Sequence, residues 1–339
     1  MKDITLQDNG LQESAVQDNT LSADTLQGKV PQKNPGKKSK FRKKIQKAKK
    51  NPSETVVYSV VWILLALWAV LLLYPVFWLL LNSLKTVDQY YDNIFYAKPF
   101  ELPEQWAFYN YREAFINISL KGQTNADFFV MLFNTLWYCA LRVGMGIFVP
   151  LATAYAMAKY RFPGREAIYA FVITTMTLPV FGTNGAAFTF YYDIGLYNTP
   201  WYVIFTGLGG FGGAFLMMYG YFKSVSWSYA EAVYIDGGND YTVFFRIMLP
   251  MAMPLMVTFG VISFIGAWND SGTMLIYLPD FPTLASGVFE LSNGNDTLRF
   301  TNPPAYFALL TIMALPVVVI FIIFSDKIMN NLSIGGIKG

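Results

Sequence analysis

Histidine is absent from the 339 residues, and cysteine occurs once, as Cys139. The lack of histidine removes the commonest protein ligand of transition metals and the commonest general base. A single cysteine excludes a disulfide within the chain. The Gly-x4-Gly-Lys-Ser/Thr loop that cradles nucleotide phosphates is also missing. We therefore expect no catalytic site, no metal site, no cofactor bound by this chain and no ATP hydrolysis by it alone.

Charge is scarce as well, because charged residues make up 14% of the chain and hydrophobic residues 54%. A soluble domain carries about 25% charged residues. Residues 56–83 contain no charge at all, and about 20 apolar residues are enough to cross a bilayer. The composition predicts an all-α polytopic membrane protein with about six transmembrane helices. We expect these spans at 56–82, 128–158, 167–190, 200–222, 251–276 and 305–325, with Arg142 interrupting the second and Pro179, Gly182 and Gly185 the third.

Basic residues indicate which ends of the spans face the cytoplasm. Residues 1–55 form a polar and then polybasic tail, which we expect to be disordered. The later basic residues lie in alternate loops, at Lys159, Arg161 and Arg165, at Lys223 and Arg246, and at Lys327 and Lys338. Since lysine and arginine are enriched on the cytoplasmic side, both termini are predicted to be cytoplasmic. The tail is either a retention signal for the first span or a contact for anionic membrane lipid.

The loop between the fourth and fifth spans, residues 223–250, has the pattern of two short helices joined by a turn. We expect the first helix to begin at Ser228 as N-cap, with Glu231 completing a capping box. Gly237 suits a left-handed turn after that helix. A second helix should follow and end at Pro250, where the chain re-enters the bilayer. A helical pair at the cytoplasmic surface indicates contact with a partner.

This loop resembles the signature Glu-Ala-Ala-x3-Gly-x9-Ile-x-Leu-Pro of the membrane subunits of bacterial binding-protein-dependent ABC importers. The matching residues are Glu231, Ala232, Gly237, Ile247, Leu249 and Pro250, while Val233 replaces the second alanine. Ile-Asp-Gly around Asp236 and Trp-Asn-Asp at 268–270 resemble the carbohydrate-uptake branch, the maltose-permease-like subunits. The resemblance covers approximately residues 56–339 and implies the type I ABC importer permease fold.

The resemblance implies a transport subunit for sugar, with oligosaccharide as the expected cargo, in the bacterial plasma membrane. The implied partners are a second homologous permease in a heterodimer, two cytoplasmic ATPase subunits that hold ATP and magnesium, and an extracytoplasmic sugar-binding protein; nucleic acid is not among them. In this family the loop forms a coupling helix that sits in a groove of the ATPase. The coupling residues would be Glu231, Ala232, Asp236, Gly237, Ile247, Leu249 and Pro250.

Two further groups of residues are candidates for contact with cargo or with the binding protein. Trp268, Asn269 and Asp270 could form a wall of the translocation path, with the indole stacking on a sugar and the polar groups accepting bonds from its hydroxyls. A structural hydrogen-bond cluster between helices is the equal alternative. The outer loop 277–304 is the expected docking loop for the binding protein, with turns at Gly287, Asn293 and Gly294.

Two other functions fit much of the same pattern. The same ABC machinery could import peptides or amino acids, since the coupling loop does not report the cargo. An ion-coupled secondary transporter is the other alternative, but such proteins place carboxylates or histidines at membrane depth. Asp270 is the one obvious intramembrane acid in the sequence.

Overall fold

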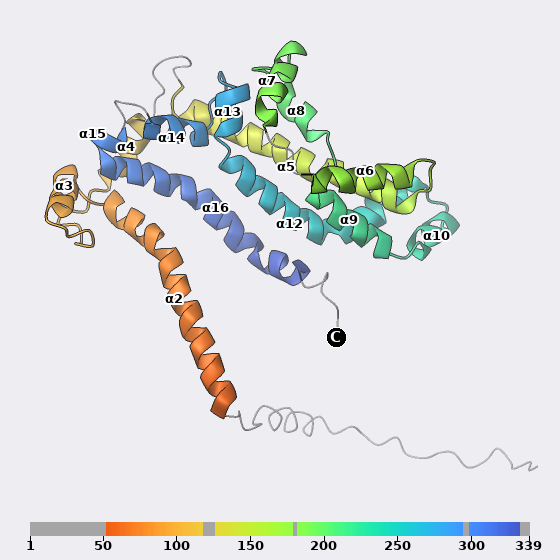
Figure 1. Cartoon of the computed structure of the whole chain (residues 1–339), viewed down its shortest axis with the longest axis horizontal. Helices are drawn as coiled ribbons and strands as arrows, with labels where there is room; N and C mark the ends of the chain where they lie inside the picture. The colour runs from red at the N-terminus through yellow and green to blue at the C-terminus, as the bar shows by residue number, and fades with distance from the viewer. Residues whose placement is uncertain (1–51, 118–125, 179–181, 294–297, 333–339) are drawn as a thin grey trace, which may run out of the picture. The chain divides into compact units, whose positions relative to one another are not determined.

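The computed structural model describes residues 52–117, 126–178, 182–293 and 298–332 (Figure 1). The chain forms two units, Met1–Trp68 and Ala69–Gly339. All packing described below lies within the second unit. Throughout the described ranges the regular elements are helices, as the apolar composition predicts.

The helices follow one another along the chain with short connections. In order they are α2 (Pro52–Ser83), α3 (Val87–Phe95), α4 (Tyr109–Asn117), α5 (Phe128–Lys159), α6 (Arg165–Thr177), α7 (Thr183–Asp193), α8 (Trp201–Gly207), α9 (Gly213–Ser224), α10 (Ser228–Ile235), α11 (Asp240–Thr242), the π-helical turn η1 (Val243–Met248), α12 (Leu249–Trp268), α13 (Gly272–Tyr277), α14 (Leu284–Asn293), α15 (Leu298–Thr301) and α16 (Pro303–Leu332).

Four continuous helical stretches of the described chain are long and apolar enough to cross a bilayer. They are Thr55–Ser83, Phe128–Lys159, Asp240–Trp268 and Pro303–Asp326, and they correspond to the first, second, fifth and sixth predicted spans. Arg142 does not interrupt α5, which also continues through Pro150. The long Arg side chain allows this, because it can carry its charge away from apolar surroundings.

The third and fourth predicted spans, 167–190 and 200–222, are not continuous helices. The first of them is divided into α6 and α7, and Gly182, the N-cap of α7, has a positive φ of 76°. Pro179 lies outside the described residues. The second is divided into α8 and α9, and Gly210 in the break has a φ of +61°. Residues with a side chain rarely adopt this backbone conformation, so a glycine is needed at each of the two breaks.

The break between α8 and α9 is held close to α5. A β-carbon at Gly207 would lie 2.6 Å from Cβ of Met145, and one at Gly210 would lie 2.9 Å from Cγ1 of Val149. The hydroxyl of Thr153 donates to the carbonyl of Gly210 across 3.2 Å. The short glycine segment therefore approaches α5 more closely than residues with side chains could.

Helix α5 is the central element of the second unit, since it packs against α8, α9, α12 and α14. Two clusters of buried apolar side chains lie along it. The first gathers Met131, Tyr138, Trp268, Met274, Leu284 and Leu309 near the beginning of α5. The second gathers Leu151, Tyr155, Phe215, Phe222, Ala230 and Met248 near its end. The second cluster includes the base of the predicted coupling loop and so attaches that loop to α5, α9 and α12.

Candidate coupling loop and cavities

Helix α10 begins one residue earlier than a cap at Ser228 requires. Trp227 is the N-cap and makes no side-chain cap bond. The Oγ of Ser226 accepts from the N–H of Ser228 at 3.3 Å and lies 2.8 Å from the Ser228 hydroxyl. The predicted capping box of Ser228 and Glu231 is therefore wrong, because Ser228 is already helical and its N–H is served by the serine two residues before it.

The two faces of α10 differ in exposure. Ala230 is fully buried, and Val233 packs against the same apolar cluster. On the other face Glu231 and Ala232 are exposed, and Ile235 is 86% exposed. The Glu231 carboxylate has no ion-pair partner among the described residues. An exposed carboxylate beside an exposed isoleucine is a surface suited to a protein partner.

The turn after α10 is a Schellman motif built by two glycines. Gly237 has a φ of +81°, which confirms the predicted left-handed turn, and its N–H donates to Tyr234 O at 3.0 Å. The N–H of Gly238 donates to Val233 O at 2.8 Å. A β-carbon at Gly238 would lie 2.4 Å from Cγ1 of Val233. Gly238, which sequence reasoning did not single out, therefore leaves room for the valine that departs from the family signature.

A hydrogen bond between side chains also links the two halves of the loop. The phenol of Tyr234 on α10 donates to the carboxylate of Asp240 on α11. This bond, more than the small loss of solvent, raises the pKa of Tyr234 to about 12. Asp236, by contrast, is the exposed C-cap residue of α10, and the helix ends at Ile235.

The second half of the loop continues into the membrane helix without a stop. Asn239 caps it, because its Oδ1 accepts from the N–H of Thr242 at 3.0 Å. From Asp240 the helix runs unbroken to Trp268, so the prediction that Pro250 ends a helix is wrong. The π-helical turn η1 ends at Met248, two residues before Pro250. Such a turn changes the pairing of backbone groups near the proline, which has no N–H to donate.

The remaining signature residues lie at the base of the loop. Ile247 and Leu249 are half-buried, and Leu249 packs against the second apolar cluster. Tyr241 and Phe245 are instead 74% and 57% exposed. They are further exposed apolar side chains of the coupling loop. The sequence offered one weak signal for them, namely large apolar side chains in a loop expected to face the cytoplasm.

Trp268, Asn269 and Asp270 point into three different surroundings despite being consecutive. Trp268 is 4% exposed, and its indole N–H donates to Met313 O at 2.9 Å. In this conformation the indole packs α12 against α16 and is not free to stack on a sugar, which agrees with the structural alternative. Asp270 accepts from the Tyr138 hydroxyl at 2.5 Å and from the hydroxyl and N–H of Thr273 at 2.7 and 3.0 Å.

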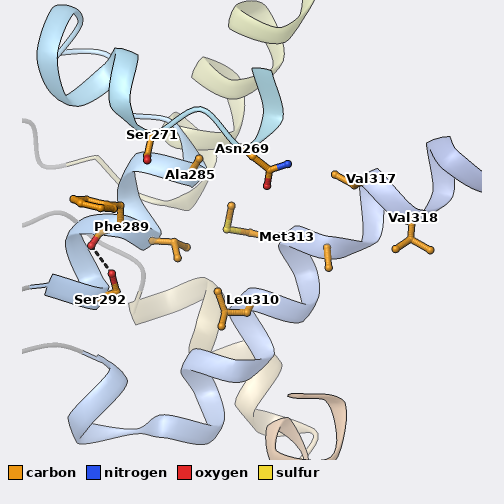
Figure 2. Close-up of a pocket in the computed structure, with 11 residues that line it drawn as sticks. Asn269, Ser271, Ala285, Phe289, Ser292, Leu310, Met313, Val317 and Val318 are labelled. Carbon is orange, nitrogen blue, oxygen red and sulfur yellow. Dashed lines mark hydrogen bonds between the residues drawn. The ribbon is translucent and has the colours of Figure 1, made fainter. Parts of the chain in front are cut away.

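Asn269 lines a pocket of about 500 Å³ between the end of α12, α14 and α16 (Figure 2). Ser271, Phe289 and Ser292 border the same space, and the Phe289 ring is 48% exposed. The pocket therefore combines an aromatic ring with an amide and two hydroxyls, a mixture that suits a ligand with apolar faces and hydroxyl groups.

The outer loop before α16 contains a helix where turns were expected. Gly287 lies inside α14 and is buried, and a β-carbon there would lie 2.5 Å from Sδ of Met131 on α5. Gly287 is therefore a packing residue, and the prediction of a docking turn at this position is wrong. Asn293 is the exposed last residue of α14, and its amide donates to Phe289 O at 2.8 Å. Gly294 lies outside the described residues.

Residues 146–332 match the model of the family described as binding-protein-dependent transport system inner membrane component. They include the break between α8 and α9, the coupling loop and the lining of the pocket between α14 and α16. The chain belongs to this family. It is therefore a membrane-embedded component of an ABC importer, a class that works with ATPase and binding-protein partners.

Several known proteins resemble the permease over most of its length. It is 28% identical over 284 residues to the diacetylchitobiose uptake system permease protein NgcG of Streptomyces coelicolor, a match that covers 80% of this chain and 86% of the relative. It is 26% identical over 282 residues to the galactooligosaccharides transport system permease protein GanQ of Bacillus subtilis, covering 82% and 94%.

A solved structure shares the fold. It is a chain of a bacterial ABC transporter involved in the import of the acidic polysaccharide alginate, with a TM-score of 0.66 and 21% identity, and the match covers 81% of this permease and 98% of that chain. Its likeness supports the type I importer permease fold that the sequence resemblance implies.

Proposed function

We propose that this permease forms half of the translocation pathway of an ATP-driven sugar importer, with an oligosaccharide as cargo. The observation that carries the coupling part is α10, a short helix with Ala230 buried against the membrane helices and Glu231 exposed without an ion-pair partner. The sugar part rests on relatives named for the transport of diacetylchitobiose and galactooligosaccharides. These relatives favour sugar over the peptide and amino-acid alternative.

The partners follow from the family. The proposed complex contains a second, homologous permease in a heterodimer, two cytoplasmic ATPase subunits that hold ATP and magnesium, and an extracytoplasmic sugar-binding protein. This chain contributes no ATPase site of its own. Both termini and the α10 loop face the cytoplasm, as the lysine and arginine distribution predicts.

The proposed coupling acts through rigid packing. Movement of the ATPase subunits displaces α10, whose buried face is joined through η1 to α12 and through the second apolar cluster to α5. Helix α12 ends beside Asn269, which lines the pocket between α14 and α16. The next residue, Asp270, lines a second cavity at the break between α8 and α9. A displacement of the cytoplasmic loop would thus reach the cavities along packed helices rather than through flexible chain.

The test replaces Glu231 by alanine in the complete importer. We expect a lysine or arginine of an ATPase subunit to bind this carboxylate, and the variant removes that charge-assisted hydrogen bond of about 1.5 to 3 kcal/mol. The affinity for the ATPase subunits should therefore fall about tenfold or more. Co-purification measures this loss. Glu166→Ala is the matched control and should retain the ATPase normally. Glu166 is exposed in the first turn of α6, beside another loop predicted to be cytoplasmic.

The cargo is tested separately, by uptake of labelled oligosaccharides and of labelled peptides into cells that contain the whole importer. Uptake of an oligosaccharide that requires ATP and is lost in Gly237→Val supports the proposal. Uptake of peptides without uptake of any oligosaccharide would show that the cargo is a peptide and not a sugar. Transport by the purified permease without any ATPase would exclude an ABC mechanism and favour an ion-coupled transporter.

A further inference from the structure

A cavity of about 440 Å³ lies at the break between α8 and α9. Its walls come from α5, from the break itself and from the end of α12, and the lining includes Arg142, Ser263 and Asp270. This volume lies within the range of small-molecule sites, about 300 to 1,000 Å³. It is separate from the pocket between α14 and α16, with which it shares no lining residue.

Arg142 is the unusual residue of this cavity. It lies in the middle of α5, an apolar helix long enough to cross the bilayer, and it is half-buried. Arg142 makes no ion pair with another described residue, so the guanidinium lines the cavity without a carboxylate partner from the described chain. A charged group at membrane depth is costly unless it is paired or serves a ligand.

Asp270, the acid in the same cavity, is already engaged. Its two oxygens accept three hydrogen bonds, from the Tyr138 hydroxyl and from the hydroxyl and N–H of Thr273. A carboxylate has about four acceptor positions, so most of its capacity is used within α5, α12 and α13. Arg142 therefore offers unused donors to the cavity, and it is the charged group there that is still free to bind a ligand.

The beginning of α9 adds positive potential to the same space. Gly212, Gly213 and Ala214 line the cavity, and α9 is a 12-residue helix with no side-chain cap. The first backbone hydrogen bond of α9 runs from the N–H of Leu216 to the carbonyl of Gly212. The N–H groups before Leu216 therefore have no partner within the helix. Such a terminus carries roughly half a positive charge and favours anions.

We propose that this cavity binds the anionic group, a carboxylate or sulfonate, of an acidic saccharide. Arg142 supplies a planar fork of donors that matches two oxygens of such a group, and the start of α9 supplies further N–H donors. This inference rests on the proposed function and names the class of sugar within it. The other possible occupant is a carboxylate of the second permease.

The experiment measures binding to the purified importer with its ATPase subunits and without the binding protein, whose own selectivity is thereby removed. The probes are labelled trigalacturonate, which is acidic, and labelled maltotriose, which is neutral. Trigalacturonate should bind more tightly. Arg142→Gln should weaken the binding of trigalacturonate by about ten- to hundredfold, the effect of losing a charge-assisted hydrogen bond. The affinity for maltotriose should stay unchanged.

The controls separate charge at this site from charge in general. Arg112→Gln removes an exposed arginine on α4 and should change neither affinity, while Arg142→Lys should restore part of the preference. Ala214→Leu should weaken the binding of trigalacturonate, because the larger side chain fills the cavity at the start of α9 while Arg142 stays in place. This variant tests the inference if Arg142→Gln does not assemble. Equal affinity for both probes, no binding of either, or unchanged trigalacturonate affinity in Arg142→Gln would overturn the inference.

The remaining outcomes distinguish this inference from the proposed function. Loss of the permease pair in Arg142→Gln with unchanged trigalacturonate affinity would assign Arg142 to the sister subunit and overturn the anion site. Glu231→Ala in the same preparation should lose ATPase retention and keep trigalacturonate binding. A wild-type protein that binds trigalacturonate yet transports without ATPase would refute the proposed function and leave the anion site standing.

Discussion

Replacement of Gly238 by alanine should loosen α10 through one identifiable contact. The new β-carbon would lie 2.4 Å from Cγ1 of Val233 and 3.0 Å from its carbonyl oxygen. Val233 is β-branched and packs against the second apolar cluster, so it has few other rotamers to adopt. Relief of the overlap must therefore come from a shift of α10 or of the turn.

Overpacking of this kind costs about 1 to 3 kcal/mol. Val233→Ala removes the atom that clashes and restores the residue of the family signature, so the double variant should recover a large part of that loss. The matched control is Gly237→Ala. Nothing lies within 4 Å of a β-carbon at Gly237, and its cost of about 1 to 2 kcal/mol comes from the left-handed backbone, so Val233→Ala should not rescue it.

Amide hydrogen exchange of α10 in the assembled importer measures these costs as local opening. Exchange should be about five- to a hundredfold faster in Gly238→Ala and should approach the wild-type rate in the double variant. ATPase retention should follow the same order. If Val233→Ala rescues neither glycine variant, or rescues both equally, the steric account of the Schellman turn is refuted.

Three further changes test the packing around the cavities, each by thermal unfolding of the purified complex. Trp268→Phe should destabilise the protein by about 1 kcal/mol through the lost hydrogen bond to α16 and leave the affinity for sugar unchanged. A changed sugar affinity with normal stability would show instead that the indole contacts the cargo. Tyr138→Phe should cost about 1.5 to 3 kcal/mol, because Asp270 loses a hydrogen bond to a charged group, and an unchanged melting temperature would contradict that contact. Gly287→Ala should cost about 1 kcal/mol or more by overlap with Met131, and Met131→Ala should remove this specific penalty; a penalty that stays the same would show that α14 does not rest on α5 at this point.

The amount that could be read from the sequence differs between helices. The four continuous spans follow from long runs without charge, because any such run must bury its backbone polar groups in a helix when it enters a bilayer. The same runs could not reveal the breaks between α6 and α7 or between α8 and α9. Glycine is common in continuous membrane helices too, and only the approach of Gly207 and Gly210 to α5 shows why the chain breaks there.

The candidate residues show the same division. The left-handed turn at Gly237 was predictable because that conformation depends on the residue itself. The capping box at Ser228 and the helix end at Pro250 were predicted wrongly. Ser226, and not a capping box, accepts from the Ser228 N–H, and the π-helical turn η1 leads into α12 without a break before Pro250. The sequence pattern did not distinguish these arrangements from the predicted ones. Gly287 looked like a turn residue, but Met131 is packed against it from a helix far away in the chain.

The sequence by itself determined that this chain is helical and enters the membrane, and that its inner loop carries a family signature. Hydrophobicity, charge distribution and a short motif are properties of neighbouring residues, so they need no knowledge of the fold. Only the tertiary structure decided that Trp268 is buried against α16, that Asp270 is held by Tyr138, and that Arg142 lines a cavity with the start of α9. These facts depend on which helices lie side by side, and local sequence does not encode the distance between them.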